Sequence, residues 1–313
     1  MELRHLRCFI AVAEELHFAR AAERLHIEQS PLSRTIKELE EELGVRLFVR
    51  TTRNTRLTVA GKLFLEHVQR VFIALEQARE SVKAAANGFY GQLRVALSDG
   101  ITPSRLSLLL ALCRQEEPEV EIRLFEIPLA QQIRGLHDDL YDIGFGKSDE
   151  VGEGLIASAV WSDPLMVAVP ERHPLLAYTR IPLDEVLRYP LVLCDPQVCE
   201  GHTRQIDRVL RRSNLDPLIA ERVSSFDLMM ALISAGFALG LVTEPYMTIS
   251  RESGVVVRPL EGRSPMLTTY LLRREDETSE VISRFISRVQ TIEFPKRLRP
   301  GVSAVSQMEK DVN

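Results

Sequence analysis

Five basic residues occur between Leu43 and Leu65 with no acidic residue among them. They are Arg46, Arg50, Arg53, Arg56 and Lys62. Contact with nucleic-acid phosphates requires such a local excess of positive charge, whatever the charge of the whole chain. The formal net charge is −5, but residues 1–92 hold 14 Lys and Arg against 12 Glu, and the remainder holds 25 basic against 32 acidic residues. The charge pattern therefore predicts a nucleic-acid contact in the N-terminal region.

A set of polar residues precedes this basic stretch. It consists of Gln29, Ser30, Ser33, Arg34 and Lys37. Such side chains can bond base edges and phosphates when a helix presents them from its first turns. Ser30 followed by Pro31 is typical of a helix start, and Gly44 is typical of a helix end. The alternative is that Arg34 and Lys37 only solvate a helix face. The basic residues nearby favour the DNA-reading interpretation.

Three short helices and a small hairpin are expected to position these side chains. Apolar residues recur at helical spacing over 6–16 and again over 21–25, with a break near His17. The helix of residues 30–43 follows, and residues 47–50 and 55–57 predict two strands of a basic hairpin. This order of elements predicts a winged helix-turn-helix.

A long helix is expected from Thr58 to about Gly88. Its apolar residues recur in steps of four and three, at Phe64, Val68, Val71, Leu75, Ala78, Val82 and Ala85. A mean period of 3.5 residues is typical of a coiled coil, so this helix is predicted to pair with another copy of itself. The alternative is one amphipathic helix that packs on its own domain.

Strands and helices alternate after Gly91, which predicts an α/β architecture with parallel strands. The expected strands are 93–97, 120–126, 142–146, 191–194, 239–242 and 266–272, and the expected helices are 103–115, 130–140, 204–212, 226–234 and 279–291. A second block begins near Asp163, and the last strand and helix return to the first block. Two lobes joined by two crossing strands should leave a ligand cleft between them. Residues beyond Phe294 are predicted to have no fold of their own.

The N-terminal region resembles the LysR-type transcriptional regulators. The resemblance rests on Ala21-Ala22, Gln29-Ser30-Pro31, Ser33, Leu39-Glu40, Leu43-Gly44, Leu47-Phe48, Arg50, Leu57-Thr58 and Ala60-Gly61, and continues more loosely to about residue 292. It implies a cytoplasmic regulator, not an enzyme, that binds a double-stranded operator and a small-molecule coinducer. It also implies that copies of the chain associate through the long helix into a dimer or tetramer. RNA polymerase is a further expected partner if the protein activates transcription, and no membrane partner is expected. His17-Phe18 departs from the pattern, because many relatives have a small residue or Ser there.

The resemblance implies the following boundaries and DNA contacts. The fold is an all-α winged helix-turn-helix domain (1–58) and a linker helix (59–90), followed by an effector module of two Rossmann-like lobes of the periplasmic-binding-protein type (91–292) and a tail (293–313). Lobe I comprises 91–162 and 267–292, and lobe II comprises 163–266. The expected DNA-binding residues are Gln29, Ser30, Ser33, Arg34, Lys37, Arg50, Thr51, Arg53 and Arg56.

Four further runs resemble regulators of aromatic-compound breakdown: EIPLAQQIRGL, DIGFGK, DPLMVAVPERHPL and SAGFALGLVTEP. By that resemblance the effector site consists of Ser98, Asp99, Gly100, Leu129, Lys147, His202, Phe226 and Thr243. Backbone amides near 98–100 and the Lys147 ammonium could hold a carboxylate. Asp99 would repel an anion unless it is protonated or paired, and Lys147 could instead be a solvated residue after a strand.

Cys194, Cys199 and His202 form a C-x4-C-x2-H pattern in the same region. It could be a thiol redox switch or a soft-metal site, although two thiols and one imidazole fall short of a closed tetrahedral site and such cysteines are often buried hydrophobes. No glycine-rich phosphate loop or nucleophile motif is present, so neither a cofactor nor a catalytic site is expected. A two-lobed solute-binding protein and an α/β enzyme are the alternatives. The charged N-terminus, which lacks signal-peptide character, argues against the first.

Overall fold

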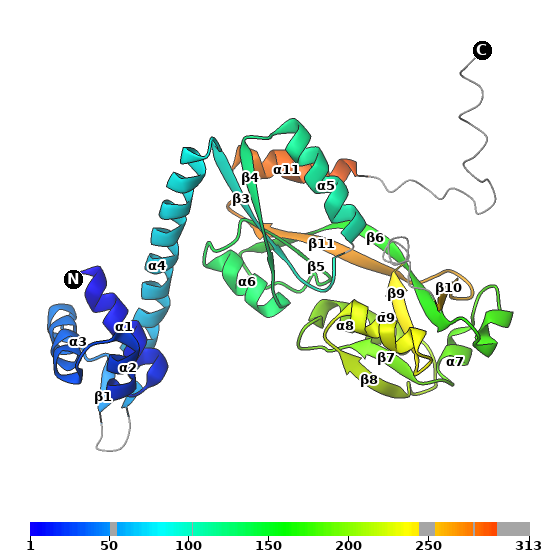
Figure 1. Ribbon diagram of the computed structural model, residues 1–313, viewed down its shortest axis with the longest axis horizontal. Coiled ribbons are helices and arrows are strands. Elements are labelled where there is room, and N and C mark those ends of the chain that lie inside the picture. The colour runs from blue at the N-terminus through cyan, green and yellow to red at the C-terminus, as the bar shows by residue number, and fades with distance from the viewer. Residues whose placement is uncertain (51–54, 102, 244–253, 278, 293–313) are drawn as a thin grey trace, which may run out of the picture. The chain divides into compact units, whose positions relative to one another are not determined.

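The computed structural model describes residues 1–50, 55–101, 103–243, 254–277 and 279–292. It forms two compact units (Figure 1). The first contains residues 1–88 together with 138–140, and the second contains the rest of the described chain. The predicted tail beyond Phe294 lies outside the described residues.

The first unit has the predicted order of three helices, a hairpin and a long helix. Its elements are α1 (Leu3–Glu15), α2 (Phe18–Leu25), α3 (Gln29–Leu43), β1 (Phe48–Arg50), β2 (Thr55–Leu57) and α4 (Val59–Ala86). Aliphatic side chains from all three short helices are buried in one core, where Phe9 packs against Phe48 and Phe64. Because Phe64 belongs to α4, the start of the long helix is part of this core.

The helix ends differ in detail from the prediction. Helix α3 begins at Gln29 after the N-cap residue Glu28, so Ser30 and Pro31 lie inside its first turn. Pro31 is tolerated there because first-turn amides have no partner within the helix. His17 is the N-cap of α2, and its Nδ1 atom accepts a hydrogen bond from the Arg20 amide at 3.3 Å. An imidazole thus performs the capping that a small hydroxyl residue usually provides.

Close contacts attach the hairpin to the helices on both sides. The Glu40 carboxylate accepts hydrogen bonds from the Leu47 and Phe48 amides at 2.7 and 3.0 Å. Thr58, the N-cap of α4, accepts from the Gly61 amide and donates to the Arg46 carbonyl. A Cβ atom at Gly61 would lie 2.1 Å from the Leu47 carbonyl oxygen, so only glycine permits this approach. The hairpin, α3 and the start of α4 therefore form one rigid body.

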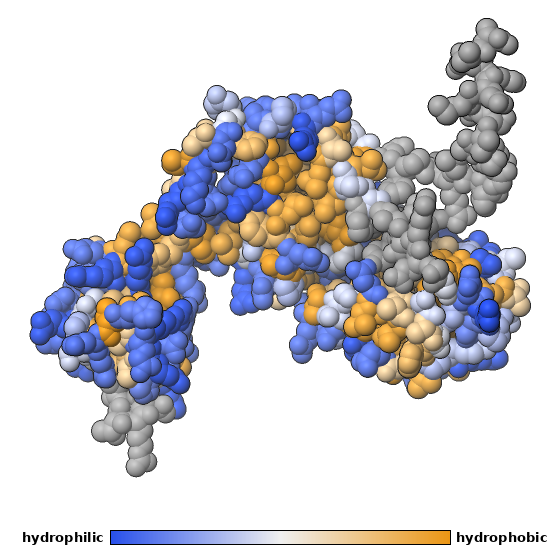
Figure 2. All heavy atoms as spheres, in the orientation of Figure 1, coloured by the Kyte–Doolittle hydropathy of each residue, from blue (hydrophilic) through white to orange (hydrophobic). Residues whose placement is uncertain are grey.

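The apolar residues of α4 divide into two stripes, whereas the sequence predicts one. Phe64, Val68 and Phe72 pack into the core of the first unit. The second stripe is exposed and consists of Val71, Ala74, Ala78, Val82 and Ala85. Val71 is 45% exposed and Val82 is 71% exposed. Figure 2 shows hydrophobic side chains along α4 beside the hydrophilic surface of the short helices. Packing on the same domain thus accounts for only part of the apolar pattern.

The second unit contains the two predicted α/β lobes. Its elements are β3 (Gly91–Leu97), α5 (Pro103–Glu116), β4 (Val120–Glu126), α6 (Leu129–His137), β5 (Ile143–Gly146), β6 (Leu155–Pro170), η1 (Pro174–Ala177), α7 (Leu183–Val186), β7 (Leu191–Cys194), α8 (Glu200–Leu210), β8 (Ile219–Val223), α9 (Phe226–Ser234), β9 (Leu239–Thr243), β10 (Val255–Pro259), β11 (Met266–Arg274) and α11 (Glu280–Thr291). The strand order is β4-β3-β5-β11-β6-β9-β7-β8, and β10 pairs with β6. The predicted two-lobe fold is confirmed.

Two long antiparallel strands connect the lobes. Strand β6 pairs with β11 over residues 155–164 and with β9 over residues 165–168. It therefore belongs to lobe I in its first half and to lobe II in its second half. Strands β3, β4 and β5 and strands β7 and β9 are parallel, as predicted, whereas β11 runs antiparallel to its neighbours. The sequence analysis did not predict β8, which is parallel to β7, or β6, which is antiparallel to β9, β10 and β11. A lobe boundary therefore runs where these strands cross.

Candidate functional site

Helix α3 presents a polar face opposite its buried face. Leu32, Ile36 and Leu39 are fully buried, which fixes the rotation of the helix. As a result, the predicted DNA-contacting side chains project outward. Gln29, Ser30, Arg34 and Lys37 are exposed, and Ser33 is half-buried. The arrangement is suited to groove entry from the amino-terminal turns.

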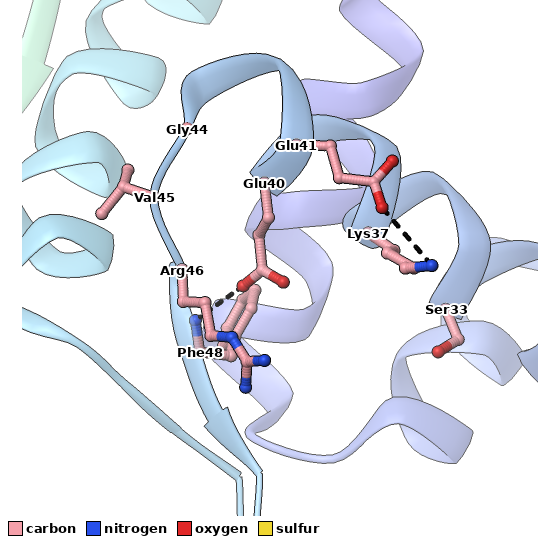
Figure 3. Close-up of a pocket in the computed structure, with 8 residues that line it drawn as sticks. All are labelled: Ser33, Lys37, Glu40, Glu41, Gly44, Val45, Arg46 and Phe48. Carbon is pink, nitrogen blue, oxygen red and sulfur yellow. Dashed lines mark hydrogen bonds and ion pairs between the residues drawn. The ribbon is translucent and has the colours of Figure 1, made fainter.

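A hollow of about 480 Å³ lies between the second half of α3 and the segment that leads to β1 (Figure 3). It is lined by Ser33, Lys37, Glu40, Glu41, Gly44, Val45, Arg46 and Phe48. Figure 3 shows the Lys37 ammonium directed toward Glu41, and these groups form an ion pair at 3.4 Å. Arg46 is exposed at the other side of the hollow. Positive groups thus lie on both sides of it, although Glu41 partly neutralises one of them.

The hairpin carries the remaining predicted DNA contacts. Arg56 is exposed on β2, and its backbone pairs with Val49 of β1. The backbone of Arg50 pairs with Thr55. The side chain of Arg50 and the whole of Thr51 and Arg53 lie outside the described residues. A basic hairpin beside a helix that presents polar side chains is the arrangement in which the wing contacts phosphates and the helix contacts bases.

Six of the eight predicted effector-site residues meet at the lobe boundary. Ser98, Asp99 and Gly100 follow β3, Lys147 follows β5, His202 lies in the first turn of α8, and Phe226 begins α9. Gly100 has φ +62°, and a Cβ atom there would lie 2.2 Å from the Phe226 ring. The His202 and Phe226 rings meet edge to face at 5.2 Å. Lobe I and lobe II are therefore in direct contact at this site.

The Asp99 carboxylate is the central group of the site. Its Oδ1 atom accepts hydrogen bonds from the Gly201 amide at 2.8 Å and the His202 amide at 3.3 Å, both at the amino end of α8. Its Oδ2 atom accepts from the Lys147 amide at 2.9 Å. Asp99 is thus paired, which answers the objection that it would be an isolated negative charge. The carboxylate occupies the position where a helix amino end best stabilises an anion.

Lys147 lies inside the protein rather than in solvent. Its side chain is 2% exposed, and its ammonium is 3.3 Å from the Thr269 hydroxyl. Burial lowers the pKa of Lys147, while the negative charges of Asp163 and Asp99 oppose that change. The solvated-residue interpretation of Lys147 is therefore wrong. A buried ammonium is suited to holding an anion, because burial makes an unpaired charge costly.

Two charged residues that the sequence analysis did not select also lie at this boundary. The Arg105 guanidinium forms an ion pair with Asp163, and both side chains are buried. Arg105 also stacks over the Trp161 ring, which in turn stacks on Phe145. Asp163 marks the point where β6 passes between the lobes. One feature of the sequence could have identified Asp163, namely its position beside Pro164 at the predicted start of the second block.

Ser98 and the two remaining predicted residues, Leu129 and Thr243, have structural surroundings. The Ser98 hydroxyl lies 3.0 Å from Gln132 Oε1, within lobe I. Leu129 belongs to the apolar core of the same lobe. Thr243 is buried at the end of β9, where it pairs with Leu165. Ser98 and Leu129 both pack around Gly146. They therefore support, from the lobe I side, the loop that contains Asp99.

His202 is buried, and its Nδ1 atom has no hydrogen-bond partner among the described residues. Burial, together with the charge of Lys147, lowers the pKa of His202 to about 3. The imidazole is therefore neutral at physiological pH. A buried imidazole nitrogen without a partner is unusual in a folded protein and marks a place where a polar ligand atom could bind.

Cys194 and Cys199 form a pair of thiols beside this site, and all four cysteines of the chain are buried and free. The hydrogen bond between the two thiols raises the pKa of Cys194 and lowers that of Cys199. Within the described ranges, no cluster of three His, Cys, Asp or Glu side chains could hold a metal ion, so His202 does not complete such a set. None of the helices in the described part has the length and apolar character of a membrane span.

A neutral His202 has a testable pH dependence. An unfolded chain takes up this proton near pH 6.5 and the folded protein near pH 3. The folded state should therefore lose stability as the pH falls through this interval, by about 1.4 kcal/mol per pH unit. Nitrogen-15 NMR of histidine-labelled protein should show a neutral imidazole at pH 5 that is missing in His202→Gln. A His202 signal that titrates near pH 6 would contradict this assignment.

The DNA-reading surface predicts different effects for its two kinds of arginine. Arg56→Ala should weaken binding to all duplexes and reduce the salt slope by about one phosphate contact. Arg34→Ala should also reduce the preference for the operator, by up to about 3 kcal/mol. Fluorescence anisotropy with the DNA upstream of the gene, at several salt concentrations, measures both effects. Arg188→Ala in the second unit is the control for loss of one positive charge. An unchanged salt slope for Arg56→Ala would exclude Arg56 from phosphate contact.

Comparisons with known proteins agree with this organisation. Residues 3–62 match the model of the bacterial regulatory helix-turn-helix protein, lysR family, and residues 86–292 match the LysR substrate binding domain. The chain is 35% identical over 250 residues to the uncharacterized HTH-type transcriptional regulator YnfL of Escherichia coli K12, covering 80% of this chain and 84% of that protein. It is 30% identical to the HTH-type transcriptional regulator ClcR of Pseudomonas putida, covering 92% and 97%.

A solved structure supports the same assignment. Full-length CbnR in complex with its target DNA matches with a TM-score of 0.72 and 27% identity, covering 93% of this chain and 99% of that chain. These matched proteins are regulators rather than enzymes, and the family models span both units. The chain therefore belongs to the LysR family of DNA-binding transcriptional regulators, with an N-terminal helix-turn-helix domain and a C-terminal effector-binding domain.

Proposed function

We propose that this regulator acts in the cytoplasm and responds to a small organic acid of aromatic or muconate-like structure, which binds between the two lobes. Residues 1–58 would read the operator, residues 59–90 would join copies of the chain, and residues 91–292 would bind the acid. RNA polymerase would be a further partner if the protein activates transcription. The resemblance to regulators of aromatic-compound breakdown supports the choice of acid.

One observation carries the acid proposal: the lobe boundary already binds a carboxylate. The α8 amides and the Lys147 amide converge on Asp99, and the charges of Asp163 and Asp99 favour the charged form of Lys147. A free carboxylate would find the same donors there. His202 offers an additional unpaired nitrogen, and Phe226 offers an aromatic surface for a flat ligand. These groups together suit an aromatic or conjugated acid.

The proposed DNA contacts follow from the surface of the first unit. Gln29, Ser30, Ser33 and Arg34 would approach base edges, because they lie in the first turns of α3. Lys37 and Arg56 would contact phosphates on either side. Arg50, Thr51 and Arg53 are proposed as further wing contacts from the sequence pattern alone.

The exposed stripe of α4 supports self-association. Valine and alanine side chains along one side of a 28-residue helix would be removed from water by a second copy of the helix. A two-fold pair would also place two α3 helices to match an inverted-repeat operator.

Replacement of Val71 and Val82 together by Asp should separate the subunits. Two carboxylates in each helix, and thus four in the pair, would cost several kcal/mol, so the protein should sediment as a smaller species and bind its operator more weakly. Gln69→Asp adds a negative charge at an exposed polar position on the side of α4 away from this stripe and is the control. A Val71/Val82 variant that sediments like the parent protein would rule out pairing through this stripe.

The acid proposal is tested by calorimetric titration of the full chain with benzoate, cis,cis-muconate and the uncharged analogue benzamide. Lys147→Met should weaken binding of the acids at least about tenfold, or 1.4 kcal/mol, and affect benzamide much less. Arg172→Met removes an exposed charge and is the control. Absence of binding by every acid, or acid affinities that do not change in Lys147→Met, would contradict the proposal.

A further inference from the structure

The backbone at Asp99 adopts a conformation that costs free energy. Its φ is +60°, and Gly100, which follows, has φ +62°. Non-glycine residues rarely adopt this left-handed region, although Asp and Asn tolerate it better than most. Leu16 and His26, which also have positive φ, are helix C-caps, whereas Asp99 lies two residues after the end of β3. The turn directs the Asp99 carboxylate across the lobe boundary to the amino end of α8.

The opposite side of the boundary fits this carboxylate closely. A Cβ atom at Gly201 would lie 2.6 Å from Asp99 Oδ2 and 2.8 Å from the Lys147 carbonyl carbon. Only glycine therefore allows α8 to come this near. Further along the helix, Gln205 bonds to the backbone of Lys147 and Thr268. The close contact between the α8 amides and Asp99 is thus part of a continuous contact between α8 and lobe I.

Among the described residues, the buried charges at this boundary are balanced. Two buried acids, Asp99 and Asp163, face two buried bases, Lys147 and Arg105. His202 contributes no charge, because burial keeps it neutral. An acid added to this cluster would leave one negative charge uncompensated in a region shielded from water, which is strongly unfavourable. An acid that took the place of the Asp99 carboxylate would instead inherit its hydrogen bonds.

We propose that Asp99 is a resident competitor for the carboxylate of the effector, so that an acid binds by exchange with Asp99 and not by addition to the site. This proposal rests on the proposed function. A group tethered by a short loop acts at an effective concentration of about millimolar or more, so Asp99 sets the affinity that a free acid must exceed. Once displaced, Asp99 moves to solvent and takes its charge with it, and the closed contact between α8 and lobe I has to rearrange. Asp99 therefore determines specificity for the acid group.

Two substitutions of Asp99 test the proposal in the full-length protein. Asp99→Asn keeps the shape and tolerates a positive φ but removes the charge, and Asp99→Gly removes the side chain at a φ that glycine adopts freely. Both variants should bind benzoate or cis,cis-muconate at least about tenfold more tightly than the parent protein in calorimetric titration. Asp142→Asn, which removes a carboxylate paired with Arg94 inside lobe I, should leave the affinity unchanged.

A second measurement follows the contact itself without any acid. Hydrogen exchange of the peptide that contains Gly201 and His202 should be faster in both Asp99 variants, because their amides lose an anionic acceptor. Faster exchange with tighter acid binding supports the proposal. If the parent binds an acid and both variants bind it equally or more weakly, Asp99 is not a competitor and the proposal is overturned while the proposed function stands. If neither the parent nor the variants bind any acid, both are overturned.

Discussion

The contact of the Asp99 carboxylate with the amino end of α8 is the interaction that joins the two lobes of the effector-binding domain at their boundary. Three features of the boundary make this contact: the left-handed turn after β3, the glycine Gly201 and the buried ammonium of Lys147. Each of these features has a cost when taken alone. Left-handed backbone is strained, glycine weakens a helix, and a buried lysine loses hydration. Together they form a closed set of hydrogen bonds and opposite charges, so that the arrangement is stable as a whole.

The connection through β6 and β11 explains why such an interaction can matter far from where it forms. Strand β6 runs from lobe I into lobe II, so a change in the contact between α8 and lobe I would have to be absorbed near the point where β6 changes partners. Trp161 and the ion pair of Arg105 with Asp163 lie at this crossing. The crossing therefore lies at the same lobe boundary as Asp99 and Lys147.

Local patterns in the sequence predicted the first unit and most elements of the second. Helices α1 to α3 follow from apolar spacing and end signals, which depend only on neighbours in the chain. Strand β8 was missed because its outward residues, including Glu221 and Arg222, do not alternate with apolar ones. The unbroken strand β6 was missed because Pro164 interrupts its pattern at the point where it changes partners. The predicted effector residues were selected by resemblance. However, the bond between Asp99 and Gly201 joins residues 102 positions apart, and spacing alone could not predict it.

The close contact of Gly61 with Leu47 has a mechanical consequence. Because α4 starts inside the core of the DNA-binding domain, it cannot swivel relative to α3 without breaking that core. A helix of 28 residues is about 42 Å long, so it acts as a lever arm whose base is fixed in the recognition domain. A tilt of about 10° at one end displaces the other end by about 7 Å, which approaches the width of a DNA groove. A rearrangement at the far end of the helix would therefore be transmitted to the domain that carries α3.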